Sequence, residues 1–359
     1  MRVAALTVRS FRNLAEASIA FPPDGVAIVG PNGHGKTNLL EALAYPVLFR
    51  SVRGAPDREI GRFGGPGFHV ELDGDGTAVA ATYYAPVGRK RIVVNGEERG
   101  TIAAAIGGWL AVGFYPTDLA LVRGGAAERR RWLDRMLSLA DRVYLEALLH
   151  YRAALAQRNA ALRGNDVQSA GAFDAALAKH GATIAATRRQ WLARMAGRWQ
   201  EELATLGESA PVSLRYRGDD ALADPALWGE RLDASRERDL ARGQTHTGPH
   251  RDDLVLGLAG HALRHYGSTG QQRSAAIALR LLELETLAEA RGVRPALLVD
   301  DVFAELDHQR QRRLAARLVA RPGQRIVTAP RAEEIPAELA LPVWEMRAGE
   351  LRQDATVAA

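Results

Sequence analysis

The residues best suited to chemistry lie in one stretch, residues 29–42, which reads VGPNGHGKTNLLEA. Gly30, Gly35, Lys36 and Thr37 have the spacing G-x-x-x-x-G-K-[ST]. In this pattern the glycines let backbone N–H groups turn toward phosphate oxygens, and the helix that follows adds its positive end. We expect Lys36 to contact the β and γ phosphates of a nucleotide and Thr37 to bind Mg²⁺. The residues predicted to surround the phosphates are Gly30, Pro31, Asn32, Gly33, His34, Gly35, Lys36, Thr37 and Asn38.

The scarcity of lysine supports this interpretation. The chain has 47 Lys and Arg residues, but its only lysines are Lys36, Lys90 and Lys179. A chain that uses arginine for nearly every cation keeps a lysine in the glycine loop. A compact ammonium fits a phosphate cradle that the wide guanidinium fork does not fit. The lysine therefore favours a phosphate-binding role for the loop.

A second pair of chemical residues follows an apolar strand predicted at 295–299. Asp300 and Asp301 end this run. An acid at the end of a buried strand commonly accompanies a phosphate loop, and we expect Asp300 to hold Mg²⁺ opposite Thr37. Asp301 would orient or deprotonate the attacking water. Taken with the loop at 30–37, the two acids predict nucleotide hydrolysis.

A third candidate is the segment GSTGQQR at 267–273, just before a predicted helix. It offers backbone N–H groups and a helix N-terminus to an anion. In ABC-type ATPases a motif of this shape caps the ATP that is bound by the opposite subunit. The alternative is an ordinary helix N-cap, with Ser268 or Thr269 capping and glutamine following. The sequence leaves both interpretations open.

The remaining pattern predicts the elements that position these residues. Short strands are expected at 3–9, 26–29, 68–72, 77–84, 90–94, 254–258, 295–299 and 325–328, with a loop region at 54–67, a hairpin turn at Asn95-Gly96 and a hydrophilic tail. Apolar residues at helical spacing predict one long helix or two between 127 and 163, and more helix at 172–206, where a Trp and Met stripe is most simply core. Residues 211–240 are expected to be loops and short strands. No sustained heptad predicts a long coiled coil.

Composition limits the class of protein. A chain of 359 residues with 47% hydrophobic residues is expected to form two lobes. The net charge of +5 permits a polyanionic partner such as nucleic acid. The absence of cysteine excludes disulfides and thiolate metal sites. With no membrane-length apolar run and no signal peptide, we expect a cytoplasmic protein with no membrane partner.

The motifs together resemble those of the RecF family, bacterial recombination mediators related to the SMC group of ABC-type ATPases. The similar pieces are SFRNL, GPNGHGKTNLLEA, FYPTDLALVRGG, ERRRWLD, YRAALAQRNAALR, THTGPHRDDL, YGSTGQQRS and LLVDDVFAELD. They follow the family's order along most of the chain. Residues 51–110 and 165–240 are the least covered.

The resemblance implies an α/β fold, an ABC/SMC-type ATPase head with a P-loop mixed sheet plus an antiparallel sheet, and an inserted mainly helical lobe without a long coiled coil. The head would comprise residues 1–115 and 241–359, and the lobe residues 116–240. The cofactors would be ATP and Mg²⁺, with Thr37 and Asp300 as metal ligands. Carried over by residue, the catalytic set would be Lys36, Asp300 and Asp301, and the residues reaching ATP across a dimer would be Ser268, Gly270, Gln271 and Asp307.

The implied function is ATP-dependent DNA binding in recombinational repair. The resemblance also associates the protein with DNA replication and the SOS response. An ATP-dependent homodimer would form on DNA at junctions of single and double strands, largely without sequence preference. RecR is the expected partner, with RecO and RecA in the same pathway, where RecA is loaded at single-strand gaps. The enzyme would be a weak, DNA-stimulated ATPase in which ATP acts mainly as a dimerisation switch.

Three departures from the usual ATPase pattern point to slow turnover. Transporter-type relatives place a histidine at the end of the strand after the second acid, where this chain has Thr328-Ala329, and no clear glutamine loop follows the first helix. Asp301 is also shorter than the usual glutamate. The alternatives are a P-loop kinase or GTPase, a transporter ATPase subunit, and a non-enzymatic DNA-binding scaffold with a vestigial site.

Arginine clusters are the candidates for DNA contact. The alternative interpretation is that these arginines only form the solvent-exposed faces of helices. The sequence has no zinc finger or RNP motif that would indicate recognition of bases. Binding is expected to be directed at the backbone and sensitive to salt. The candidate arginines are Arg129, Arg130, Arg131, Arg188, Arg189, Arg194, Arg198, Arg310, Arg312 and Arg313.

Overall fold

The fold was analysed on a computed structural model that describes residues 1–62 and 64–353. Position 63 of the predicted loop and positions 354–359 of the predicted tail lie outside the described residues. The chain divides into two compact units. The first comprises Met1–Asp118 and Glu283–Ala359, and the second comprises Leu119–Leu282.

The first unit contains a six-stranded mixed sheet with the strand order β15-β14-β3-β13-β12-β8. The strands from β14 to β8 are parallel, and β15 is antiparallel at the edge. Central strands such as β12 are buried on both faces, which explains their continuous apolar sequence. Their bounds are β3 Gly25–Val29, β8 Ala111–Phe114, β12 Ala296–Asp300, β13 Arg325–Ala329, β14 Val343–Arg347 and β15 Glu350–Arg352.

The predicted hydrophilic tail is wrong in part, because it contains β14 and β15. Trp344 and Met346 alternate with more exposed residues and are buried, which is the period of a half-buried strand. The run is short and its polar residues dominate the local composition. Hydrogen bonding to β3, far earlier in the sequence, fixes it as a strand.

The second sheet of the first unit is antiparallel, with the order β2-β1-β4-β5-β6-β7. It contains the strands predicted at 68–72, 77–84 and 90–94. Asn95 and Gly96 turn the last hairpin with φ values of 52° and 80°, the left-handed pair that a type I′ turn requires. The bounds are β1 Ala5–Arg9, β2 Ala17–Ala20, β4 Gly67–Gly74, β5 Thr77–Tyr84, β6 Arg89–Val94 and β7 Glu97–Glu98.

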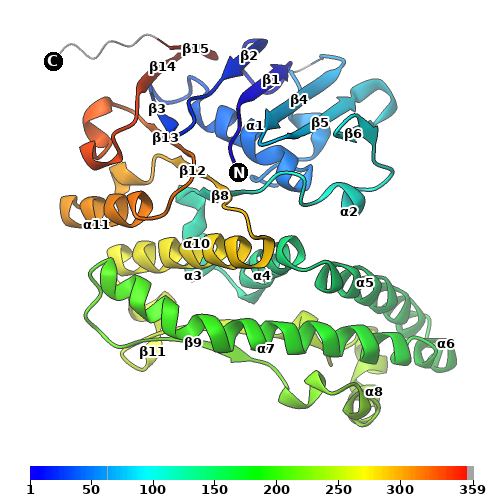
Figure 1. Cartoon of the computed structure of the whole chain (residues 1–359). Coiled ribbons are helices and arrows are strands. Elements are labelled where there is room, and N and C mark those ends of the chain that lie inside the picture. The colour runs from blue at the N-terminus through cyan, green and yellow to red at the C-terminus, as the bar shows by residue number, and fades with distance from the viewer. Residues whose placement is uncertain (63, 354–359) are drawn as a thin grey trace. The chain divides into compact units, whose positions relative to one another are not determined.

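Helix α1, Lys36–Leu48, packs against strands of both sheets of the first unit (Figure 1). Its sequence after the phosphate loop is almost wholly apolar, and Leu39, Leu40 and Leu43 are completely buried. Such a helix has no solvated face, so it forms only between two layers. The unit also contains α2 Ile102–Ala105 and α11 His308–Val319.

The second unit is built mainly of long helices. The segment predicted as one helix or two is two, α4 Ala126–Ala140 and α5 Arg142–Arg163. Asp141 separates them because its backbone is extended and its side chain accepts the N–H of Val143 as an N-cap. The predicted Trp and Met stripe is confirmed as core, since Trp191, Met195 and Trp199 of α7, Asp174–Thr205, are at most 1% exposed. Shorter helices are α3 Ala120–Arg123, α6 Val167–Gly171 and α9 Leu263–Tyr266.

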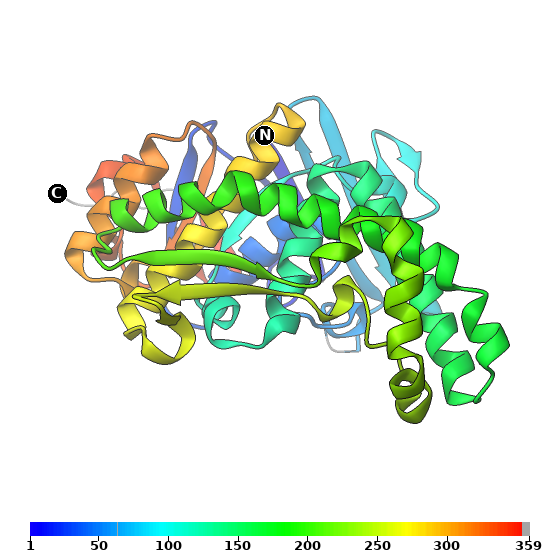
Figure 2. The same cartoon turned by 90° about the horizontal axis from the view of Figure 1, so that it is seen from below.

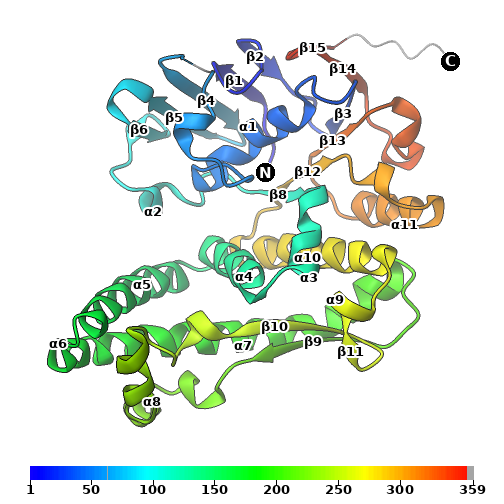
Figure 3. The ribbon, with the colours of Figure 1, turned by 180° about the vertical axis from the view of Figure 1, so that it is seen from behind.

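A three-stranded sheet, β11-β10-β9, completes the second unit. Its strands are β9 Val212–Arg217, β10 Asp253–Leu258 and β11 His261–Ala262. Figure 2 shows β9 and β10 running antiparallel beside α7, and Figure 3 labels the same strands from behind. Residues 241–282, assigned from sequence to the head, cluster with this second unit because β10 hydrogen-bonds along the whole of β9.

Residues 211–240 contain a helix that the sequence analysis missed. Helix α8, Trp228–Arg242, buries Trp228 and Leu232 together with the polar Ser235 and Asp239. Because half of its inward face is polar, the apolar residues do not recur at helical spacing. The prediction of loops and short strands is therefore wrong for residues 228–240, whereas strand β9 and the short turns up to residue 227 agree with it.

Candidate nucleotide site

The phosphate loop joins β3 to α1, as its sequence predicts. Gly30 has φ 154°, and a Cβ there would lie 2.3 Å from the carbonyl oxygen of Met346 in β14. Gly35 has φ 116° and is the residue that precedes the first turn of α1. Only glycine meets both requirements, so the glycine spacing follows from backbone geometry as well as from ligand chemistry.

Lys36 begins α1 and is 4% exposed. Its ammonium donates to the carbonyl oxygen of Gly30 at 2.8 Å and to that of Pro31 at 3.4 Å. Asn32 Oδ1 lies 3.5 Å away. The positive charge is thus held over the loop itself, where phosphate oxygens would meet it.

The parallel strands β3, β13 and β12 bring Thr328 and Asp300 to the phosphate loop at the carboxyl ends of the strands. In the sheet order, β13 lies between the phosphate-loop strand β3 and the acid-bearing strand β12. The register pairs Thr328 with Asp300 on one side and with Ile28 on the other. The hydroxyl of Thr37 donates to Asp300 Oδ1 at 3.0 Å, and that of Thr328 lies 2.9 Å from the same oxygen. Residues separated by 263 positions therefore meet as predicted.

The two acids differ in their surroundings. Burial raises the pKa of Asp300, and the charge of Asp301 raises it further, while hydrogen bonds from Thr328 and Thr37 and the charge of Arg53 lower it. Asp301 has φ 51°, a left-handed conformation that aspartate tolerates better than most residues. Its N–H donates to Thr328 Oγ1 at 3.2 Å. One threonine thus contacts both acids.

The donor set fits a hard dication. Thr37 and Asp300 supply a hydroxyl and a carboxylate oxygen that lie together, and a buried carboxylate beside a second acid needs a positive charge. Mg²⁺ is usually held by one or two protein carboxylates, water and substrate phosphates. Residues 1–62 and 64–353 contain no cluster of three or more His, Cys, Asp or Glu side chains that could hold a metal ion.

The first unit also contains a polar cluster that the sequence analysis missed. Glu41 of α1 is completely buried and accepts two hydrogen bonds from Arg12, both at 3.0 Å. Arg53 lies 2.9 Å from the same carboxylate and also donates to Asn38. The cluster ties SFRNL and the segment after α1 to the helix that carries the phosphate loop. Arg53 thereby places a cation within electrostatic reach of Asp300.

Asn13 of the SFRNL motif braces the loop directly. Its amide donates to the carbonyl of Gly33 at 3.2 Å, and its oxygen accepts from Asn38 at 2.6 Å. The turn between β14 and β15 adds a second brace, since Gly349 donates to the carbonyl of His34 at 2.8 Å. The SFRNL motif, which the sequence analysis used only as a point of resemblance, therefore holds the phosphate loop in place.

The segment at 267–273 lies in the second unit and begins α10, Thr269–Arg291. Ser268 Oγ accepts the N–H of Gln271 at 3.3 Å, and Gln271 Oε1 accepts the N–H of Ser268 at 2.8 Å. This reciprocal pair is a capping box. The N-cap interpretation is confirmed for Ser268, while a role toward a second subunit stays a prediction for Ser268, Gly270 and Gln271.

Asp307 of the first unit caps α11. Its Oδ1 accepts the N–H of Arg310 at 2.9 Å, and this bond holds the pKa of the carboxyl below its usual range. Its predicted place at a dimer seam stays a prediction.

Two of the arginines proposed for DNA contact are buried instead. Arg129 is 4% exposed and forms a bidentate pair with Asp253 at 2.8 and 3.0 Å. Arg188 is 2% exposed, pairs with Asp134 at 2.6 Å and donates to the carbonyl of Pro249 at 2.7 Å. The interpretation as surface contacts is wrong for these two residues, because their charges are already paired within the second unit.

None of the helices within residues 1–62 and 64–353 combines the length and hydropathy that a membrane crossing needs.

A family model described as an AAA domain matches residues 5–102. The chain is 37% identical over 352 residues to the DNA replication and repair protein RecF of Anaeromyxobacter sp. (strain K), with 92% of each protein covered. The same protein of Myxococcus xanthus (strain DK1622) is 36% identical over 345 residues, covering 91% of this chain and 90% of the relative.

Solved structures agree with the sequence relatives. A structure described as the recombination mediator protein RecF-ATPrS in the RecFOR pathway matches 99% of this chain and 98% of its own, with a TM-score of 0.88 and 29% identity. An Smc head domain from Pyrococcus furiosus matches with a TM-score of 0.56 at 16% identity, which shows the fold alone. The predicted ABC/SMC-type head is confirmed, and the kinase, GTPase and transporter alternatives are set aside. The chain belongs to the RecF family of DNA replication and repair proteins.

Proposed function

We propose that this protein is an ATP-dependent DNA-binding protein of recombinational repair that dimerises around ATP and hydrolyses it slowly. The observation that carries the proposal is the meeting of Thr37, Asp300 and Thr328 at one sheet edge beside the phosphate loop. That arrangement supports ATP with Mg²⁺ as the ligands. Two solved structures that match this chain are described as RecF-ATP and RecF-ATPrS.

In this proposal each side chain has a defined task. Lys36 contacts the β and γ phosphates, and Thr37 and Asp300 bind Mg²⁺, which supplies charge stabilisation of the transferred phosphoryl group. Asp301 orients the attacking water. Because the carboxylate of Asp301 is short and its backbone is left-handed, its reach is limited, which supports slow turnover.

The segment at 268–271 is proposed to complete the site of a second copy. Its capping box satisfies Ser268 and Gln271 locally, which fixes the loop in one conformation. Gln272, 5% exposed, braces the loop further by donating to the carbonyl of Gly267 at 3.0 Å. A pre-ordered helix N-terminus is suited to meet an anionic γ-phosphate without further ordering cost. With Gly270 and Asp307 it would make ATP the link between two chains.

The proposed ligand on the nucleic-acid side is DNA at junctions of single and double strands, bound largely without sequence preference. RecR is the proposed direct partner, with RecO and RecA acting in the same gap-repair pathway. The formal net charge of +5 supports a polyanionic partner such as DNA.

The test is light scattering of the full chain with a non-hydrolysable ATP analogue, with and without a gapped DNA. Wild type should become dimeric with the analogue, and DNA should strengthen the dimer. Ser268→Arg should stay monomeric, whereas Ser268→Ala, which removes the same cap, should still dimerise after about 1 kcal/mol of lost helix stability. Wild type that remains monomeric with the analogue while hydrolysing ATP rapidly would overturn the proposal.

Lys36→Met and Asp300→Asn separate the proposal from a vestigial nucleotide site. Both variants should lose analogue-dependent dimerisation. If both dimerise and bind gapped DNA as wild type does, the protein is a scaffold whose nucleotide site is not used.

A further inference from the structure

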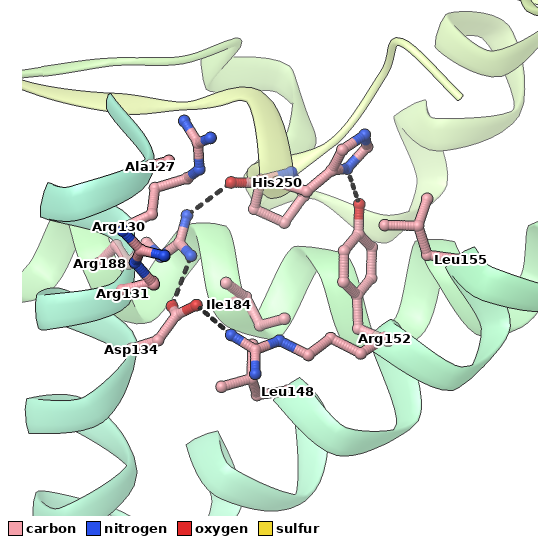
Figure 4. A pocket seen from close by; sticks show the side chains of 12 residues that line it. Ala127, Arg130, Arg131, Asp134, Leu148, Arg152, Leu155, Ile184, Arg188 and His250 are labelled. Atoms are coloured by element: carbon pink, nitrogen blue, oxygen red, sulfur yellow. Dashed lines mark hydrogen bonds and ion pairs between the residues drawn. The ribbon is translucent and has the colours of Figure 1, made fainter. Parts of the chain in front are cut away.

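A pocket of about 200 Å³ lies within the second unit, between α4, α5, α7 and the segment before β10 (Figure 4). It is several times the roughly 30 Å³ that a water molecule occupies in the liquid, and smaller than the roughly 300 Å³ of a drug-sized site. One small organic group fits this volume. The lining residues are Ala127, Arg130, Arg131, Asp134, Leu148, Tyr151, Arg152, Leu155, Ile184, Arg188, Pro249 and His250.

The charge of the lining is strongly unbalanced. It contains four arginines and one carboxylate, Asp134. That carboxylate is already divided between Arg188 at 2.6 Å and Arg152 at 2.9 Å. Burial and the nearby positive charge of Arg188 lower the pKa of Arg130, while the charges of Asp253, Asp134 and Asp252 oppose this shift. The pocket therefore has more cationic groups than its own acid can neutralise.

The arginines are available to different degrees. Arg188 is 2% exposed, and besides Asp134 its guanidinium donates to Tyr144, Tyr216 and the carbonyl of Pro249, so it is structural. Arg152 is 55% exposed and Arg131 is 68% exposed, and the ion pair of Arg131 is with Glu128 of α4, a partly exposed carboxylate outside the pocket lining. Arg130 is half-buried, and its Nη1 donates to the carbonyl of Asp252 at 2.6 Å. Arg130, Arg131 and Arg152 can therefore turn N–H groups toward a bound anion.

Most of the rest of the lining is apolar, apart from Tyr151 and His250. Leu148, Leu155 and Ile184 come from α5 and α7, and Figure 4 shows Ile184 in the space between the guanidiniums of α4 and that of Arg152. Burial lowers the pKa of His250 to about 4, so its ring is uncharged near neutral pH. The pocket thus offers guanidinium groups for an anion next to a surface for a flat or apolar group.

We propose that this pocket binds one phosphate-bearing nucleotide unit, with the phosphate on Arg130, Arg131 and Arg152 and the sugar or base against Leu148, Leu155 and Ile184. Guanidinium forks match phosphate oxygens in pairs, and they also stack on base planes. Two sources carry this chemistry: a nucleotide within single-stranded DNA and a free mononucleotide. The DNA source rests on the proposed function, whereas the free nucleotide source is independent of it.

The test compares Arg152→Gln with Arg142→Gln. Both arginines lie on α5, are 55% and 58% exposed, and pair with a carboxylate at 2.9 and 3.1 Å, but only Arg152 lines the pocket. Binding of dTMP and of a short oligo(dT) is measured on the full chain with excess non-hydrolysable ATP analogue, which occupies the phosphate loop. Arg130→Gln is the second variant, and thermal unfolding checks that each variant is folded.

For single-stranded DNA as the source, Arg152→Gln and Arg130→Gln should each weaken oligo(dT) binding about tenfold and reduce the slope of log K against log salt by about 0.7. For a free nucleotide as the source, dTMP binding should fall by the same factor while oligo(dT) binding is unchanged. Arg142→Gln should match wild type in both cases. In either case dTMP should bind more tightly than inorganic phosphate, because phosphate leaves the apolar wall uncovered.

Three results would overturn the inference. One is that Arg152→Gln and Arg130→Gln behave as Arg142→Gln does with both ligands. Another is that inorganic phosphate binds as tightly as dTMP. The third is that a polyglutamate peptide displaces oligo(dT) equally well at the same ionic strength, which would assign the pocket to carboxylates. Because the dTMP measurement needs no dimer, failure of the proposed ATP switch leaves this result readable.

Discussion

The hydroxyl of Thr328 lies 2.9 Å from Asp300 Oδ1, at the end of the strand between the phosphate-loop strand and the acid-bearing strand. Thr328 is completely buried, and its oxygen also accepts the N–H of Asp301. Transporter-type relatives are expected to have a histidine at this position. Here a threonine holds the two acids in place instead.

Replacing Thr328 with valine keeps the shape and removes the hydroxyl. A hydrogen bond to a charged group contributes about 1.5–3 kcal/mol, so we expect ATP hydrolysis in single-turnover experiments to slow by about tenfold or more. Affinity for a fluorescent ATP analogue should change little, because the phosphate loop is untouched. Thr328→Ser should restore most of the rate, and equal rates for the valine and serine variants would contradict this role.

Asp301 is expected to act on the water and not on nucleotide binding. Asp301→Asn keeps a residue that tolerates φ 51°, and it should reduce single-turnover hydrolysis by about 100-fold or more with ATP affinity retained. Asp301→Glu should cost about 1–2 kcal/mol of stability, because a left-handed backbone is costly for glutamate. Urea unfolding measures this cost, and a glutamate variant as stable as wild type would show that the backbone relaxes freely.

Glu41 should be essential for stability of the first unit. Glu41→Ala leaves Arg12 and Arg53 without their shared carboxylate and should lower the free energy of unfolding by about 3–5 kcal/mol. The matched control is Glu98→Ala, which breaks an ion pair of the same 3.0 Å length to Arg91 where the acid is 45% exposed. That change should cost less than about 1 kcal/mol. Similar losses in the two variants would show that burial does not matter here.

His250 should make the second unit sensitive to acid. Its Nδ1 accepts from the hydroxyl of Tyr151 at 2.6 Å, and its Nε2 donates to the carbonyl of Thr245 at 3.0 Å. Burial lowers the pKa to about 4, and the charges of Arg251 and Arg130 add to this while that of Asp239 opposes it. The unfolded chain binds a proton near its ordinary pKa, so stability should be lost as pH falls from about 6.5 to 4, by at most about 1.4 kcal/mol per pH unit.

The measurement is urea unfolding at pH 7 and at pH 5 for wild type and His250→Gln. The variant lacks the titrating ring, so its stability should fall less over this interval. An equal fall in both proteins would assign the acid sensitivity to other groups.

The site was predictable where its residues are close in sequence. The loop at 30–37 and the acids at the end of β12 could be predicted because local spacing and a buried strand define them. Thr328 was noticed only as a departure, because its neighbours depend on strand order and register. Arg12, Glu41 and Arg53 were missed because a buried cluster drawn from separate segments has no local pattern.

The fold shows the same limit. Strands β4, β5 and β6 have alternating residues and clear turns, and they were predicted almost to their ends. Helix α8 was missed because it buries Ser235 and Asp239 on its inner face. Strands β14 and β15 were missed because only the pairing of β14 with β3 and of β15 with β14 distinguishes them from a polar tail.

The buried Arg188 network has a consequence for how the chain folds during synthesis. The guanidinium contacts Asp134, Tyr144 and Pro249, which lie 44 to 61 residues away along the chain. A ribosome adds roughly 5–20 residues per second, so this arginine emerges seconds before its last partner. Asp134 and Tyr144 precede it, but Nη1 lacks its protein partners and needs water until Tyr216 and Pro249 follow. We therefore expect the helical unit to mature late, in one cooperative step, after most of its chain has left the exit tunnel.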